Sequence, residues 1–152
     1  MKYRSKMRKW VYMLMFLFSF AAAGAQDFIG LTDVKIREIM SAENPGLDLD
    51  QNYRNDDFRY LKYVSGAGDE TWLIFIGKNG RCNGVRITCD SVAVAGKIKE
   101  LGKIYKSAGN NRWNFRSRGD DIRVDLKNET YFFTITYRRS DKRVRSGNER
   151  AA

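Results

Sequence analysis

Apolar residues follow two different spacings along the chain, and the difference separates helices from strands. Residues 32–41 and 92–107 carry apolar side chains at helical spacing, and Thr32 suits the N-cap of the first helix. In the second segment the apolar positions step by four, three and four residues, which places them on one helix face. These positions are Val94, Ile98, Leu101 and Tyr105. We therefore predict two helices.

Each predicted helix is followed by three segments with the spacing of strands. The clearest is 121–127, where apolar and charged residues alternate as in a strand with one buried face. The segment 71–77 is apolar at almost every position, which is typical of a central strand. The six predicted strands are 58–64, 71–77, 84–89, 112–116, 121–127 and 130–138. The acidic stretch 48–57 is predicted to be a polar loop.

This order of elements predicts an α+β fold made of two units, each a helix followed by three strands. Short turns favour antiparallel neighbours, and each helix must bury its apolar stripe against the sheet. We therefore expect one antiparallel sheet of about six strands with both helices on one face. The other face would be partly open to solvent. Its predicted polar residues are Arg86, Thr88, Asn114, Arg116, Arg123, Asp125, Lys127, Thr134 and Thr136, with Leu73, Phe75 and Phe132 as apolar exceptions.

The first 25 residues have the order of a secretory signal peptide. Five basic residues lie in 1–9, an apolar run follows, and Ala23-Gly24-Ala25 offers the small residues of a cleavage site. The run from Trp10 to Ala23 has 14 residues, fewer than the roughly 20 that a bilayer span needs. We therefore predict a periplasmic or secreted protein, with a retained N-terminal anchor as the alternative.

The net charge of +10 is concentrated at the two ends of the chain. The predicted signal peptide carries +5, and residues 138–152, predicted to be a disordered basic tail, carry +4. The single α+β domain predicted at 26–137 is almost neutral, at +1. A nucleic-acid-binding domain keeps its positive charge on the folded surface. We therefore expect no nucleic-acid partner, and membrane contact only through the signal peptide or weakly through the tail.

The chain has two cysteines and no histidine. Cys82 and Cys89 lie seven residues apart, about 23 Å in a continuous strand, whereas a disulfide needs Cα atoms within about 7 Å. We expect both thiols to be structural, with an intramolecular disulfide, or an intermolecular one at Cys82, as the alternatives. Two distant cysteines cannot supply the four ligands of a zinc site, and a thiol nucleophile commonly needs a histidine.

The position of Cys82 depends on the turn that precedes it. A two-residue turn at Asn79-Gly80 would pair Ile74 with Val85 and Trp72 with Ile87, which matches apolar residues on one face. Cys89 would share that inner face. Cys82 would fall on the opposite face unless Gly84 introduces a β-bulge.

The acidic stretch 48–57 resembles the start of a calcium loop but departs from it at two decisive positions. Tyr53 stands where the loop requires glycine, and Arg59 stands where it requires glutamate. We therefore predict no metal and no cofactor. A small carboxylate-dependent hydrolase or carbohydrate-active protein that uses this stretch is the alternative to a protein without catalysis.

The run from "YLKY" through "ETWLIFIGKNGRCNGVRITCD", "IKELGKIYKSAG" and "RWNF" to "YFFTITYR" resembles an uncharacterised group of small exported proteins of Bacteroidota. The likeness covers most of the predicted mature chain and implies a periplasmic or surface setting, but no activity. The paired helix-plus-strands order also resembles β-lactamase inhibitor proteins and small outer-membrane assembly lipoproteins. That likeness is one of topology, which does not carry function, and the chain lacks the lipid-attachment cysteine of the latter group.

Together these patterns predict an exported, non-enzymatic binding or accessory protein of the cell envelope. We expect a monomer that binds an envelope or extracellular protein through the open face of the sheet, with arginines and exposed aromatic residues as anchors. The predicted partner-binding residues are Arg86, Arg116, Arg123, Lys127, Phe75 and Phe132.

Overall fold

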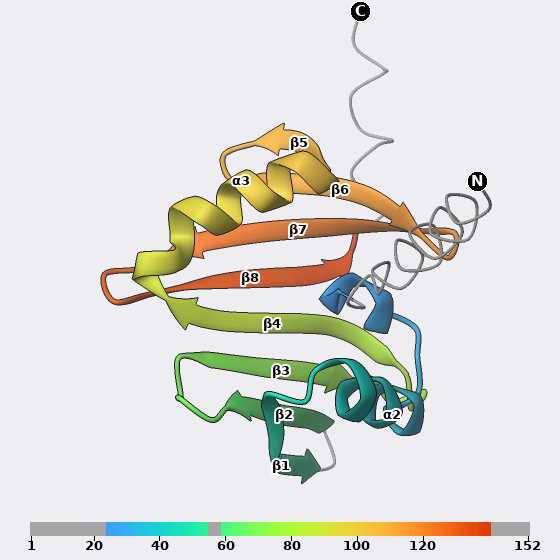
Figure 1. The fold of residues 1–152 in the computed structure, drawn as a ribbon. Helices are drawn as coiled ribbons and strands as arrows, with labels where there is room; N and C mark the ends of the chain where they lie inside the picture. The colour runs from blue at the N-terminus through green and yellow to red at the C-terminus, as the bar shows by residue number, and fades with distance from the viewer. Residues whose placement is uncertain (1–23, 55–58, 141–152) are drawn as a thin grey trace, which may run out of the picture.

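The computed structural model of the chain describes residues 24–54 and 59–140, and they form one eight-stranded antiparallel sheet with two α-helices (Figure 1). The predicted signal peptide, apart from its last two residues, and the tail beyond Ser140 lie outside the described residues. The elements in chain order are η2 (Ala25–Phe28), α2 (Asp33–Glu43), β1 (Leu47–Arg54), β2 (Arg59–Ser65), β3 (Glu70–Ile76), β4 (Cys82–Asp90), η3 (Ser91–Ala93), α3 (Val94–Ile104), β5 (Lys106–Gly109), β6 (Arg112–Ser117), β7 (Asp120–Asn128) and β8 (Phe132–Arg139).

The strands lie in the order β1-β2-β3-β4-β8-β7-β6-β5. From one edge, β1 to β4 follow one another toward the centre of the sheet, and from the other edge β5 to β8 do the same. The α2 unit supplies β1 to β4 and the α3 unit supplies β5 to β8, and β4 pairs with β8 where the two units meet. The predicted α+β class and the single antiparallel sheet are therefore confirmed, whereas the predicted units differ in detail. The predicted count is wrong, because each helix is followed by four strands rather than three.

The first additional strand is β1, which lies in the stretch predicted to be a polar loop. β1 pairs with β2 along its whole length, with a β-bulge between Leu49 and Gln51. The strand is at the edge of the sheet, where polar and charged side chains protect unpaired backbone groups from association. Only Leu47 and Leu49 alternate with polar residues in this strand, and its many acidic and amide side chains give it the composition of a loop.

The second additional strand is β5, which lies in the stretch predicted to end the second helix. α3 ends at Ile104, and Tyr105 has extended backbone angles. Tyr105 continues the apolar spacing of the helix because its ring is buried and stacks on Phe115, at 4.6 Å between ring centroids. Asn110 and Asn111 have positive φ values and turn the chain from β5 into β6.

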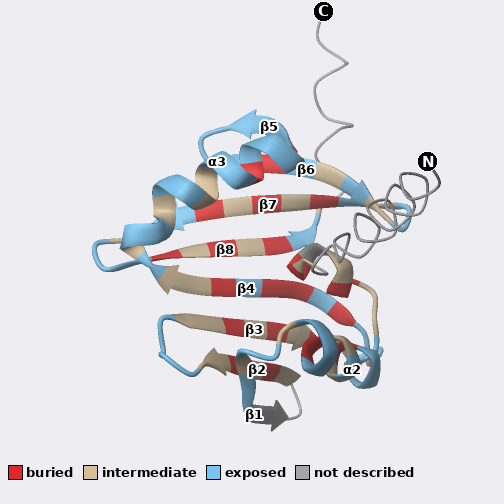
Figure 2. Cartoon of the chain, in the orientation of Figure 1, coloured by how far each residue is buried: buried red, intermediate tan, exposed pale blue. Residues whose placement is uncertain are grey.

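The core lies on one face of the sheet, and both helices cover that face (Figures 1 and 2). One row of cross-strand neighbours is buried across six strands and consists of Leu61, Ile74, Val85, Tyr137, Val124 and Trp113. Ile36 and Met40 of α2 and Leu101 of α3 are buried above this face. Phe28 of η2, which packs beside β4, is fully buried and forms a tilted ring pair with Trp72.

The β3–β4 hairpin explains where Cys82 lies. The turn has three residues instead of the two predicted, since the Gly77 N–H donates to the Arg81 carbonyl. A β-bulge at Asn83 then restores the predicted pairing of Ile74 with Val85 and of Trp72 with Ile87. The bulge places Cys82 opposite Ile76 on the core side, where its side chain is buried.

Candidate functional site: the open face of the sheet

The face opposite the helices carries the residues that alternate with the core along each strand. Neither described helix covers it (Figure 1). One row of cross-strand neighbours on this open face runs from β3 to β6 and consists of Leu73, Arg86, Thr136, Asp125 and Arg112. The open face thus combines apolar side chains on β3 with charged ones on β4, β6, β7 and β8.

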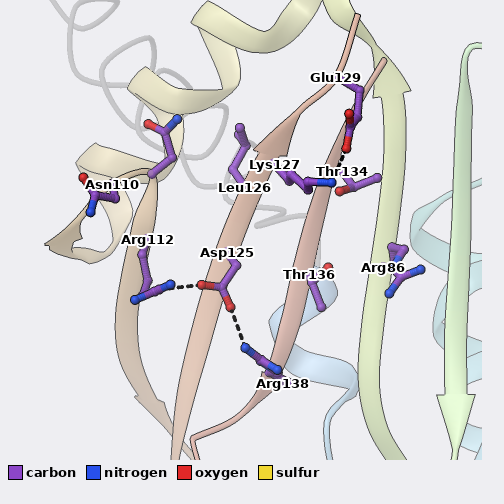
Figure 3. Close-up of a pocket in the computed structure, with 11 residues that line it drawn as sticks. Arg86, Asn110, Arg112, Asp125, Leu126, Lys127, Glu129, Thr134, Thr136 and Arg138 are labelled. Atoms are coloured by element: carbon purple, nitrogen blue, oxygen red, sulfur yellow. Dashed lines mark hydrogen bonds and ion pairs between the residues drawn. The ribbon is translucent and has the colours of Figure 1, made fainter. Parts of the chain in front are cut away.

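A depression of about 590 Å³ lies on this face (Figure 3). Its floor is formed by the short side chains of Thr134 and Thr136, which point outward from the central strand β8. Longer side chains on the flanking strands and the β5–β6 turn form its walls. The lining residues are Arg86, Asn110, Asn111, Arg112, Asp125, Leu126, Lys127, Glu129, Thr134, Thr136 and Arg138.

Asp125 organises one wall of the depression. Its carboxylate accepts hydrogen bonds from Arg112 Nε at 2.6 Å and from Arg138 Nη2 at 3.2 Å, so that β6, β7 and β8 are joined through one acid (Figure 3). Lys127 forms a separate ion pair with Glu129 at the far end. The carboxylates in the depression are therefore already paired with cations.

Arg86 lies on the opposite wall and has a different environment. Its guanidinium carbon is 5.9 Å from the centroid of the Phe75 ring, which is cation–π distance. Gly84 is the direct cross-strand neighbour of Phe75, and a side chain at this position would meet the Tyr137 carbonyl oxygen at 3.3 Å. Arg86 forms no ion pair with a residue in 24–54 or 59–140.

All six predicted partner-binding residues lie on the open face. Arg86 and Lys127 line the depression, whereas Phe75, Arg116, Arg123 and Phe132 lie around it on β3, β6, β7 and β8. Arg123 is directly opposite Arg138, and its Nε atom is buried without a hydrogen-bond partner. Phe132 is 43% exposed at the beginning of β8.

Sequence reasoning did not select six residues that line the depression, namely Asn110, Asn111, Arg112, Leu126, Glu129 and Arg138. Arg138 is both the last residue of the predicted strand 130–138 and the first of the predicted tail, and β8 continues one residue further, to Arg139. The alternation of Thr134, Thr136 and Arg138 would have indicated this. Arg138 and Arg139 both form ion pairs with acids of the described chain, so the sheet carries more positive charge than predicted.

The two cysteines are free thiols in environments that oppose ionisation. Burial raises the pKa of Cys82 to about 12, and its Sγ lies 3.4 Å from the carbonyl oxygen of Gly84, to which the thiol can donate. Burial, followed by the negative charge of Glu70, raises the pKa of Cys89 to about 11. Both thiols are thus almost entirely protonated at neutral pH, which is unlike a nucleophilic cysteine.

The acidic stretch proposed for hydrolysis lies away from the open-face depression. Asp48 and Asp50 lie on the edge strand β1, and Asp50 pairs with Lys62 at 2.7 Å. Asp56 and Asp57 lie outside the described residues. Within 24–54 and 59–140, no three acidic or cysteine side chains gather as metal ligands would. Asp48 also lines a second hollow of about 380 Å³ beside the end of α2.

No protein-family model, curated protein or solved structure matches this chain. The resemblance to exported proteins of Bacteroidota and to β-lactamase inhibitor proteins therefore stays a prediction. In the described part of the chain, the helices are too short or too polar to span a lipid bilayer.

Proposed function

We propose that this protein is exported to the periplasm or the cell surface and acts there as a binding or accessory protein without catalysis of its own. It binds an envelope or extracellular protein as a monomer, and the open face is its contact surface. The observation that carries the proposal is an uncovered sheet face with a depression whose floor is threonine and whose walls are charged. The export step comes from the sequence of residues 1–25.

The chemistry of the open face suits a protein partner better than a small substrate. The depression is open and its carboxylates are held by Arg112, Arg138 and Lys127, whereas general acid–base catalysis needs a free carboxyl group in a shielded cleft. Half-buried Leu73 and Phe75 lie on the same face beside Arg86. Aromatic and arginine side chains are the residues that most often dominate the binding energy of protein interfaces.

The size of the face is sufficient for an interface. Eight strands about 4.8 Å apart span about 34 Å, and strands of six or seven residues are about 20 Å long. The resulting area of about 700 Å² is close to the roughly 800 Å² that one partner contributes to a standard interface. A single partner could thus cover much of the open face.

Site-specific photocrosslinking tests this proposal. A benzoylphenylalanine replaces Thr88, which lies on the open face, and in a matched variant it replaces Lys99, which is exposed on α3 on the other side of the sheet. We expect an adduct with one envelope or extracellular protein from position 88 and none from position 99. Adducts from position 99 alone, or none from position 88 or from a second open-face position at Thr71, would refute the proposal.

A further inference from the structure

Three arginines on the open face have no acidic partner in the described chain. Arg86, Arg116 and Arg123 form no ion pair with any residue of 24–54 or 59–140. They lie on β4, β6 and β7 and surround the Arg112–Asp125–Arg138 group. The open-face positions of β4 to β8 and the turn after β7 carry seven basic residues and four acidic ones. The basic residues are Arg86, Lys106, Arg112, Arg116, Arg123, Lys127 and Arg138, and the acidic ones are Asp90, Asp121, Asp125 and Glu129.

The excess of positive charge is concentrated at Arg123 and Arg138. They are direct cross-strand neighbours on β7 and β8, and like charges at such positions destabilise a sheet. Asp125 pairs with Arg138 but forms no ion pair with Arg123, whose Nε atom is buried and lacks an acceptor. A buried donor without an acceptor costs free energy. A bound anion between these two guanidinium groups would relieve the repulsion between them.

We propose that the partner of the open face presents an acidic segment, with one carboxylate held between Arg123 and Arg138 and an apolar side chain against Leu73 and Phe75. This inference rests on the proposed function and specifies the chemistry of the partner. A guanidinium pair matches the planar, two-oxygen geometry of a carboxylate. The apolar side chains lie on β3, two strands from Arg138 across β4, so an extended chain that crosses the strands reaches both.

The distribution of charge favours a protein segment over other polyanions. Nucleic acids, anionic polysaccharides and anionic lipid surfaces are bound by continuous basic surfaces, but here acidic residues and apolar side chains interrupt the cations. The chain's own ends are poor candidates because both are basic: residues 1–9 contain five basic residues and no acidic one, and residues 141–152 contain four basic residues and two acidic ones. The occupant is therefore a separate, acidic protein.

The test uses protein purified from cells that express the full 152-residue chain and a fluorescent peptide of alternating glutamate and leucine. We expect saturable binding that weakens as salt rises, since salt screens exposed charges. Arg123→Gln should reduce the affinity about tenfold or more. The control, Lys99→Gln, removes the same charge from α3 on the other side of the sheet and should change the affinity by less than about twofold. A peptide with glutamine in place of glutamate should not bind.

The outcomes separate this inference from the proposed function. Equal binding by the wild-type protein and Arg123→Gln, or tighter binding to heparin or to phosphatidylglycerol vesicles than to the acidic peptide, overturns the inference. Self-association that Arg123→Gln abolishes would assign the face to a second copy and also overturns it. If crosslinks from position 88 persist in Arg123→Gln, the open face is the contact surface but its partner chemistry is not carboxylate. If those crosslinks are absent in the wild-type protein as well, the proposed function itself fails.

Discussion

The two units have the same order of elements but differ on the open face of the sheet. In the α2 unit, β3 presents Leu73 and Phe75, both half-buried, whereas in the α3 unit β7 presents Arg123, Asp125 and Lys127. On the helix-covered face both units present buried apolar residues in continuous rows. Folding thus constrains the covered face of both units in the same way, and the open face can differ because no described helix packs on it.

The junction of β4 and β8 offers the strongest test of whether the two units are one body. Ile135 is 1% exposed and pairs with Ile87 of the other unit. Ile135→Ala should lower the free energy of unfolding by about 2–5 kcal/mol, because it removes buried methyl groups and leaves a cavity. Urea unfolding should still show one transition by tryptophan fluorescence, since Trp72 and Trp113 belong to different units.

Thr134→Ala is the control on the same strand, because Thr134 points to the open face. It should cost less than about 1 kcal/mol. Two separate transitions in Ile135→Ala would show that the units fold independently. A cost at Thr134 equal to that at Ile135 would contradict the assignment of the core to one face.

Alkaline pH should affect the α2 unit first, through its thiols, and then both units through their tyrosines. The thiols of Cys82 and Cys89 lie in the α2 unit, and their pKa values are raised from 9.0 to about 12 and about 11. Burial raises the pKa of Tyr105, in the α3 unit, from 10.0 to about 12. Because these groups ionise first in the unfolded chain, stability is full below pH 9 and falls as pH rises toward the folded-state pKa values.

We therefore expect the free energy of unfolding to fall between pH 9 and 10 through the thiols, by at most about 1.4 kcal/mol per pH unit for each thiol. Cys82→Ala combined with Cys89→Ala should extend the plateau to about pH 10. Tyr105→Phe should leave the decrease below pH 10 unchanged and reduce the decrease above it. Urea midpoints from pH 8 to 11 measure this, and an unchanged decrease in the double variant would refute the role of the thiols.

The sequence predicted the elements that bury several apolar side chains and missed the two that bury few or none. The alternation of Ile122, Val124 and Leu126 predicted β7 because that strand has one buried face. β1 and β5 escaped prediction because they are the two edge strands, where pairing on one side suffices and no apolar row is required. The second helix was predicted to continue beyond Ile104 because Tyr105 keeps the helical spacing of apolar residues. A buried ring just after a helix cannot be distinguished by its position in the sequence from one inside the helix.

The open face could be predicted as a surface, but its depression could not. Alternation within each strand placed Arg86, Thr136 and Asp125 on that face. The depression arises because Thr136 lies between Arg86 and Asp125 across strands, and this depends on the pairing of β4 with β8. No local pattern reports a pairing between strands so far apart in the chain. The contact between Asn111 and Leu126, which brings the β5–β6 turn to the rim, depends on tertiary structure in the same way.

The beginnings of the two helices provide a smaller test of the comparison between units. Thr32 caps α2, where its side chain accepts from Lys35 N at 3.4 Å. Asp90 accepts from Val92 N at 2.9 Å, but it caps η3 and not α3. Thr32→Ala should cost about 1 kcal/mol. Asp90→Ala should cost less, since η3 is short and α3 begins after it; a larger cost at Asp90 in urea unfolding would contradict this.

The smallest expected effect concerns the ion pairs of the open face. The acids in these pairs differ between the two units in how many basic partners they have and in how exposed they are. The side chain of Asp125 is 25% exposed and pairs with two arginines, whereas that of Asp50 is 45% exposed and pairs with Lys62 alone. Asp125→Asn should cost about 0.5–1 kcal/mol, and Asp50→Asn should cost less than about 0.5 kcal/mol, because exposed single pairs contribute little. Raising the salt concentration to about 1 M should remove most of both costs, since the Debye length falls to about 3 Å. If Asp50→Asn were the more costly change, the open face of the α2 unit would depend on its charges at least as much as that of the α3 unit, and the contrast between the two units would not hold.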